Sequence, residues 1–360
     1  MRALPLQRVY GELAFFLNAR VRQVKFIDRT FNCVKDRALN IWRFLKESDN
    51  GITNFHFEIS ADLLDEEAIR LLAGVREGMF QFEIGVQSTN ISVLRKIKRH
   101  TNLPGLTKNV SMLREPANVR LHLDLIAGLP GEGYTSFKQS FNDVYAMKPD
   151  ILQLGFLKAL KGTGLRNNAP DYGLVYDDCP PYEVLKTNEM TFDEISKLKD
   201  IETLVDGFYN MGLAPLTLNY LTGTGAFEFY EKFAEFWRYK GYYSSMPSKM
   251  GMYAALYEYC LQTGAAEAGL ILDFVKFDLL LRENEKNPPE WLVPRPSSEM
   301  RALYGIYRKT MGADAFNIQA FEYDIAGWAC GTPIKRRNII LFRYKNGKGR
   351  GTFCEITGRD

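Results

Sequence analysis

Apolar residues recur along the first half of the chain in two alternating patterns, one typical of strands and one of amphipathic helices. Strand and helix patterns that alternate in this way are typical of parallel βα units. Right-handed crossovers then leave either a doubly wound sheet or a barrel, and the lack of a glycine-rich dinucleotide fingerprint after the first strand favours the barrel. The predicted strands are 21–31, 54–64, 82–88, 118–130 and 151–160, and the predicted helices are 7–20, 36–47, 65–76, 90–98, 106–115 and 135–147.

Polar side chains occupy one face of these predicted strands. Side chains alternate between the two faces of a strand, so His56 and Glu58 lie opposite the phenylalanines of their own strand. Apolar faces would pack against the helices and leave the polar faces pointing into the barrel. Buried charges are costly unless they are paired or bound to something, so the lumen is predicted to hold a polar ligand. The polar set is His56, Glu58, Ser60, Glu83, Gly85, Gln87, Arg120, His122, Asp124, Gln153 and Gly155.

A structural ion-pair network inside an ordinary barrel is the alternative that strand parity leaves open. Functional sites of βα barrels lie at the C-terminal ends of the strands. Glu58, Gln87 and Asp124 all lie near such ends, which favours a binding site.

The second half of the chain has a different pattern. Residues 177–184 read DDCPPYEV and predict a proline-stiffened linker between a barrel domain, 1–175, and a mainly α-helical domain, 185–360. Within the second domain, 227–243 is predicted as a helix whose aromatic stripe belongs to the core. Residues 336–353 are predicted as a β-hairpin that turns at Asn346–Gly347 and ends the fold.

Composition and charge exclude some classes of protein. A net charge of +3 over 360 residues gives little electrostatic reason to expect nucleic acid or a membrane as a partner. No apolar run reaches the about 18 residues that a membrane span needs, and a signal-peptide pattern is absent from the N-terminus. The five cysteines are scattered and form neither a disulfide framework nor a close-spaced metal motif, so a cytoplasmic location is expected.

Four motifs occur in order along the predicted barrel. They are GVQS at 85–88, Arg99 twelve positions after Gln87, DLIAGLPGE at 124–132 and LGFLKALKGTGL at 154–165. Together they resemble the radical S-adenosylmethionine (SAM) enzymes, and the similarity extends from about residue 1 to residue 170. The sequence resembles the oxygen-independent coproporphyrinogen oxidase branch and, more closely, the radical proteins that carry an upstream cobalamin-binding domain. Residues 180–360 resemble the C-terminal domain of unknown function of that group.

The resemblance implies roles for five residues. Glu58 would lie in the polar shell of SAM, and Gln87 and Asp124 would be placed for the ribose hydroxyls. Arg99 suits the methionyl carboxylate through a charge-assisted pair. Asp28, in the FIDRTF turn, stands where many members have a glycine-rich strand end that binds the amino group.

One feature of that family is absent from the sequence. Radical SAM enzymes hold a [4Fe–4S] cluster with a CxxxCxxC loop after the first barrel strand, and one isolated cysteine cannot supply such a cluster. This chain has no CxxxCxxC, and the next cysteine after Cys33 is Cys179.

The expectation is therefore a partial barrel, strands 2–6, whose first strand, cluster loop and any cobalamin domain lie upstream of Met1. Alone, such a chain would be inactive. The resemblance leaves its small-molecule substrate and its catalytic residues unassigned. The alternative is a non-catalytic protein that binds a nucleoside-like ligand, or a partner, in the same lumen.

Overall fold

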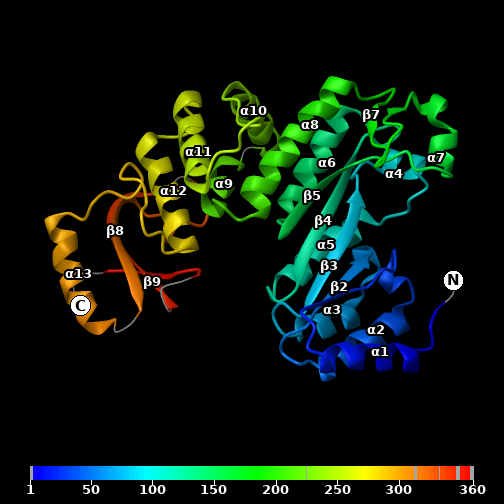
Figure 1. The fold of residues 1–360 in the computed structure, drawn as a ribbon, viewed down its shortest axis with the longest axis horizontal. Helices are drawn as coiled ribbons and strands as arrows, with labels where there is room; N and C mark the ends of the chain where they lie inside the picture. The colour runs from blue at the N-terminus through cyan, green and yellow to red at the C-terminus, as the bar shows by residue number, and fades with distance from the viewer. Residues whose placement is uncertain (1–2, 224, 312–313, 332, 346–348, 357–360) are drawn as a thin grey trace. The chain divides into compact units, whose positions relative to one another are not determined.

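The alternating apolar stretches of the first half form one parallel sheet (Figure 1). The structure is a computed structural model that describes residues 3–223, 225–311, 314–331, 333–345 and 349–356. Neighbouring strands pair in parallel in the order of the sequence, as a chain of βα units requires. The strands are β1 (Gln23–Lys25), β2 (Asn54–Ile59), β3 (Phe80–Gln87), β4 (Arg120–Ala127) and β5 (Ile151–Phe156).

Helices pack on the apolar face of this sheet. Trp42 of α2 is fully buried, and its ring centroid lies 6.2 Å from that of Phe57 and 5.8 Å from that of Phe82. Aromatic pairs at such separations contribute stability beyond the area that they bury. The helices that alternate with the strands are α1 (Leu6–Asn18), α2 (Lys35–Glu47), α3 (Glu66–Ala73), α4 (Ile91–Lys96), α5 (Leu103–Arg114) and α6 (Tyr134–Ala146).

The first strand is shorter than the predicted 21–31. After Lys25 the chain leaves the sheet, and Phe26 stacks on Phe57 with ring centroids 4.5 Å apart. A 3₁₀ turn, η1 (Phe31–Cys33), follows before α2 begins. The apolar residues after Lys25 therefore bury against the core as a loop, because packing overrides their strand pattern. A second 3₁₀ turn, η2 (Ala61–Leu63), ends the predicted strand 54–64 at Ile59 in the same way.

The chain divides into two compact units, 1–202 and 203–360, and each is described by itself. The first unit ends later than the predicted linker at 177–184. That stretch lies between two short paired strands, and the amide of Val184 donates to the carbonyl of Leu157 at 2.8 Å, so it packs onto the continuation of β5. The domain ranges 1–175 and 185–360 stay predictions. The remaining elements of the first unit are α7 (Gly164–Asn167), η3 (Ala169–Tyr172), β6 (Val175–Tyr176), β7 (Val184–Lys186) and most of α8 (Phe192–Leu204).

The second unit combines helices with an antiparallel sheet. The predicted helix at 227–243 is α10, and Phe233 and Trp237 of its aromatic stripe are fully buried in the core. The predicted hairpin is formed by β9 and β10, while its expected turn at Asn346–Gly347 lies outside the described residues. The elements are η4 (Val205–Asn210), α9 (Pro215–Leu221), α10 (Ala226–Tyr239), α11 (Lys249–Thr263), α12 (Ala268–Arg282), α13 (Ser298–Thr310), β8 (Ala315–Tyr323), β9 (Lys335–Tyr344) and β10 (Thr352–Glu355).

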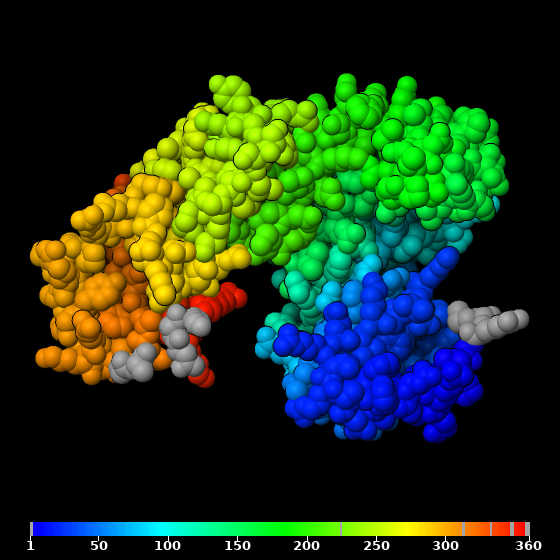
Figure 2. All heavy atoms as spheres, in the orientation of Figure 1, coloured from blue at the N-terminus to red at the C-terminus, as the bar shows by residue number. Residues whose placement is uncertain are grey.

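These observations confirm the predicted fold class, an incomplete parallel (βα) barrel followed by a mainly helical region that ends in antiparallel strands. The sequence prediction missed β8, which pairs with the other side of β9. In the space-filling view the N-terminal residues, in blue, form the lower part of the first unit, and the later residues of that unit, in cyan and green, form its upper part (Figure 2). Among the described residues, no helix is both long and apolar enough to span a membrane.

Candidate functional site

The polar face of the sheet carries a row of charged side chains at the same height on neighbouring strands. Glu58, Glu83 and His122 are direct partners across β2, β3 and β4. Lys25 donates to Oε2 of Glu83 at 3.1 Å, and Nε2 of His56 lies 2.9 Å from the same oxygen. Burial opposes ionisation of Glu83, but the Lys25 contacts outweigh it and lower the pKa of this carboxyl. Glu83 is therefore a paired anion.

Asp124 lies one step further toward the C-terminal ends of the strands. Its direct neighbours across the sheet are the uncharged Gly85 and Gln153, and Nε2 of His122 on the same strand lies 3.2 Å from its Oδ1. Oδ1 of Asp124 is buried and has no hydrogen-bond partner among the described residues. Burial, followed by the charges of Glu83 and Glu58, raises the pKa of Asp124 to about 7. A buried polar atom without a partner indicates a missing ligand or water.

Gln87, Gly85 and Arg99 form a cradle at the end of β3. Gln87 has a φ of +71°, and the β3–β4 register shifts between Gly85 and Gln87. Backbone in this region is costly for a residue other than glycine and is found most often at functional sites. A Cβ on Gly85 would lie 2.3 Å from Nε2 of Gln87 and 3.5 Å from Nη2 of Arg99. The bend thus returns the Gln87 side chain over Gly85.

Arg99 follows α4 and reaches back to β3. Its Nη2 donates to the carbonyl of Gly85, while its Nε is buried without a partner in the described structure. Burial lowers the pKa of Arg99, and the nearby carboxylates of Asp62 and Asp124 oppose that shift. An arginine stays charged at neutral pH even so. The guanidinium therefore places a positive charge beside Gln87 and Asp124.

A buried hydrogen-bond network supports the end of β3 from behind, and the sequence did not reveal it. Ser88 donates to Oε1 of Glu132 at 2.5 Å, and Ser140 donates to the same oxygen at 3.2 Å. All three residues are fully buried. Burial raises the pKa of Glu132 to about 7. The glutamate of GLPGE thus ties the turn after β4 to the residue that follows Gln87, whereas the sequence was consistent with a simple tight turn.

A cavity of about 630 Å³ opens at this end of the sheet. Gln87 and Arg99 line it together with apolar side chains from the turn after β4 and the segment after β5. Tyr172 adds an aromatic ring, over which Nζ of Lys96 lies 5.8 Å from the ring centroid. Largely apolar cavities of this size with a few convergent polar groups are typical of small-molecule sites.

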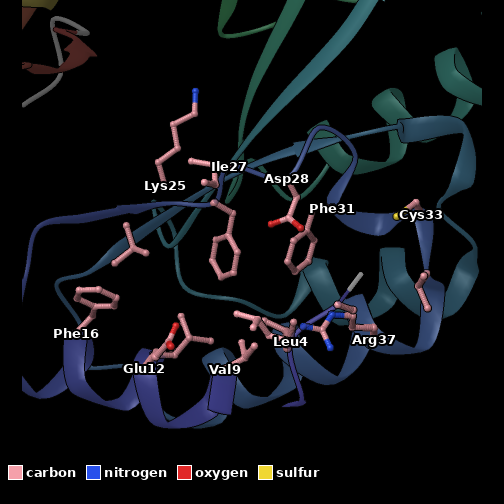
Figure 3. Close-up of a pocket in the computed structure, with 16 residues that line it drawn as sticks. Leu4, Val9, Glu12, Phe16, Lys25, Ile27, Asp28, Phe31, Cys33 and Arg37 are labelled. Atoms are coloured by element: carbon pink, nitrogen blue, oxygen red, sulfur yellow. The ribbon is translucent and has the colours of Figure 1, made fainter. Parts of the chain in front are cut away.

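Asp28 stands apart from the other four predicted site residues. It lies in the loop after β1 and lines a second cavity, of about 320 Å³, with residues of α1 and α2 (Figure 3). Figure 3 shows its carboxylate beside Phe31. Within the described residues, no hydrogen bond or ion pair joins Asp28 to Glu58, Gln87, Arg99 or Asp124. The role assigned to Asp28 stays a prediction, and these observations do not support it.

Metal ligands are not clustered in the described part of the chain. It contains no group of three or more histidine, cysteine, aspartate or glutamate residues that could hold a metal ion. Cys260 is buried, and the other four cysteines are exposed at separate places along the chain. These residues do not fit a [4Fe–4S] cluster, which needs several converging thiolates.

Comparisons with known proteins match the two halves separately. Residues 170–318 match the family described as Protein of unknown function (DUF4080). The oxygen-independent coproporphyrinogen-III oxidase-like protein HemZ of Bacillus subtilis (strain 168) is 25% identical over 166 residues, which are 37% of this chain and 33% of that protein. The chain thus spans about a third of the length of the curated relative that it matches.

Two solved structures are similar at lower identity. TsrM from Kitasatospora setae, a radical SAM methyltransferase with cobalamin and a [4Fe-4S] cluster bound, is 18% identical, with a TM-score of 0.41, over 51% of this chain and 35% of that one. Coproporphyrinogen III oxidase (HemN) from Escherichia coli, described as a radical SAM enzyme, is 20% identical, with a TM-score of 0.33, over 42% and 38%.

The parallel sheet and its polar face define the first half as a βα protein of the barrel class. More narrowly, the chain is similar to the oxygen-independent coproporphyrinogen-III oxidase-like protein HemZ, and residues 170–318 match the DUF4080 family of unknown function. The resemblance predicted for each half is confirmed.

Proposed function

We propose that the chain is part of a radical SAM enzyme and that its barrel half binds the nucleoside portion of SAM. The observation that carries the proposal is the buried Nε of Arg99, which lines the cavity at the strand ends and has no hydrogen-bond partner among the described residues, together with the buried carboxyl of Asp124, whose Oδ1 contacts Nε2 of His122 at 3.2 Å without an aligned hydrogen bond. Buried polar atoms are nearly always hydrogen-bonded in complete structures, so a ligand that supplies both a donor and an acceptor fits this place.

The chemistry of SAM matches these groups. The ribose hydroxyls can donate to the Asp124 carboxylate and exchange hydrogen bonds with the Gln87 amide. The methionyl carboxylate can accept from Arg99 in a charge-assisted hydrogen bond. Oε1 of Glu58 lies 3.7 Å from Nζ of Lys25. The Glu58 carboxylate adds negative charge to the polar face of the sheet, which suits a cationic ligand. The residues of this chain would bind and orient the cofactor, whereas a cluster held by other ligands would supply the electron for its cleavage.

The free edge of β1 suggests where a cluster-bearing segment would join. The amide of Asn54 donates to the carbonyl of Arg22, and the amide of Phe26 donates to the carbonyl of His56. Because alternate residues of a parallel strand face opposite sides, the backbone groups of Gln23 and Lys25 face away from β2. We propose that a strand carrying the cluster cysteines pairs here, with any cobalamin-binding domain attached to it.

This edge leads to a prediction about association. Unpaired edges promote pairing with other chains, so the isolated 360-residue chain should self-associate as its concentration rises. Adding the pairing segment should restore a single species, as measured by light scattering after size-exclusion chromatography. A monodisperse isolated chain at all concentrations would contradict the proposal.

Calorimetric titration of the chain with SAM tests the binding proposal directly. We expect saturable binding with one site, because the proposed nucleoside contacts all come from residues of this chain. Adenine alone, which lacks the ribose and the methionyl group, should bind far more weakly, since it has no group for Asp124 or Arg99. Equal affinity for adenine and SAM would contradict the proposed roles of these residues.

The close approach of the Gln87 side chain to Gly85 predicts how adding one methyl group at residue 85 changes the affinity for SAM. In Gly85→Ala the new Cβ would lie 2.3 Å from Nε2 of Gln87, so the Gln87 side chain must leave its place. Loss of its hydrogen bond to the ligand should weaken SAM binding by about 1 kcal/mol, roughly fivefold. Gln87→Ala should cause the same loss, and the double variant should lose no more, because both changes remove one contact.

Gly155→Ala provides a matched control on the same face of the sheet. Its Cβ would approach nothing closer than 3.4 Å, so binding should be unchanged. If the losses of SAM affinity in the two single variants add up in the double variant Gly85→Ala/Gln87→Ala, the two residues do not act through one contact.

A further inference from the structure

His122 has no role in the site described so far, although it lies two residues before Asp124 on the same face of β4. Its Nε2 is 3.2 Å from Oδ1 of Asp124. The side chains of His122 and Asp124 are only 13% and 17% exposed. This contact is at ion-pair distance rather than an aligned hydrogen bond, and the side chain of Gln153 on β5 also acts on the imidazole, where it opposes the lowering of the His122 pKa by burial. An imidazole and a carboxyl are thus buried together within proton-transfer distance.

The neighbouring charges do not occupy this pair. Glu83 lies beside His122, but its Oε2 accepts from Lys25 and contacts His56. The titratable and charged groups that face the pair are Lys25 from β1, His56 and Glu58 from β2, Glu83 from β3, Arg120 from β4 itself and Arg99 from the segment after α4, while β5 contributes the neutral Gln153.

We propose that His122 is a positioning residue for Asp124: the two side chains share one proton, and ligand binding moves it from the Asp124 carboxyl to Nε2 of His122. This inference rests on the proposed function, because the ligand hydroxyls are what require an ionised Asp124. The O–H bond of Asp124 breaks, an N–H bond forms on His122, and a neutral pair becomes a carboxylate and an imidazolium. The carboxylate can then accept the ligand's hydrogen bonds.

The electrostatics of the ligand-free site agree with this order of events. Burial, and then Glu83 and Glu58, raise the pKa of Asp124 to about 7, whereas burial lowers the pKa of His122. Of the two groups, Asp124 therefore holds the proton more tightly, and with a pKa of about 7 it is mostly protonated below pH 7 and half protonated at pH 7. Hydrogen bonds from a ligand stabilise the carboxylate, and a carboxylate beside the imidazole, together with Glu83, stabilises the imidazolium.

Proton counting by calorimetry tests the transfer. SAM binding to the full chain at pH 6.5, measured in buffers of different ionisation enthalpy, should release close to no proton, because the proton stays inside the complex. In His122→Asn the proton must leave, so binding should release roughly 0.8 proton for a group with a pKa of about 7. His100→Asn, the same change at an exposed histidine, should behave as the parent chain does.

The pH dependence of affinity provides a second readout. For His122→Asn the affinity for SAM should rise about tenfold from pH 6 to pH 8, following the ionised fraction of Asp124. For the parent chain the change should be much smaller. Equal proton release and equal pH dependence in the two proteins would overturn the role of His122.

A ligand-free measurement separates this inference from the proposed function. The chain has three histidines, so NMR can follow each imidazole, and the signal lost in His122→Asn identifies His122. Asp124→Asn should lower the titration midpoint of His122 by about one unit or more, as expected for strongly coupled groups, and leave that of His100 unchanged. Failure of SAM to bind would overturn the proposed function and the ligand-driven transfer, while an unshifted His122 midpoint would overturn the shared proton by itself.

Discussion

After anaerobic reconstitution with iron and sulfide, the 360-residue chain should hold no stoichiometric iron and should form no 5′-deoxyadenosine from SAM with a strong reductant. The reason is the distribution of thiols: Cys33 and Cys179 are the cysteines of the first unit, and they are exposed at separate places, Cys33 in η1 and Cys179 between β6 and β7. Iron analysis and mass spectrometry of the nucleoside products measure the two outcomes. If this chain alone bound iron and cleaved SAM, the proposal that the cluster ligands lie in another segment would be wrong.

Fusion to an upstream segment that carries CxxxCxxC should restore both properties together. One cluster would supply both the electron and an anchor for the methionyl group, so iron content and product should rise in parallel. A matched segment with its three cysteines changed to alanine should pair with β1 and restore neither property. If the fused protein binds iron but still does not cleave SAM, the alternative of a non-catalytic nucleoside-binding protein is favoured.

The sequence predicted the sheet better than it predicted the site. Period-two patterning in β2, β3 and β4 assigned each polar side chain to the correct face, because one face is covered by large apolar residues such as Phe57. The short β1 was not predictable in this way. Its continuation has the same apolar pattern, and only the tertiary contact of Phe26 with Phe57 shows that it leaves the sheet.

The details of the site depend on long-range contacts that a linear pattern does not contain. The positive φ of Gln87 and the approach of Arg99 to the Gly85 carbonyl follow from a register shift between two strands. The burial of Glu132 with Ser88 joins residues 44 positions apart. Strand parity did place His122 and Asp124 on one face, but it gave no sign that the two side chains would be buried in contact with each other.

Asp124→Ala should weaken SAM binding by about 1–3 kcal/mol, the usual scale when a hydrogen bond to a charged group is lost. This corresponds to roughly 5- to 150-fold in dissociation constant. Glu77→Ala, which removes an exposed carboxylate before β3, is the control and should bind SAM as the parent chain does. Calorimetry under the same conditions compares the three proteins.

Asp124→Ala, which should weaken SAM binding, should nevertheless stabilise the folded chain at pH 8. Burial raises the folded-state pKa of Asp124 to about 7, well above its ordinary value, so folding becomes less favourable as pH rises from the ordinary pKa toward 7. Asp124→Ala removes this cost, and its melting temperature should exceed that of the parent chain at pH 8 but not at pH 4. A carboxylate retained for structure would give the reverse result, with lower stability and unchanged affinity. Weaker binding together with a higher melting temperature at pH 8 is the combination expected of a residue kept for its ligand.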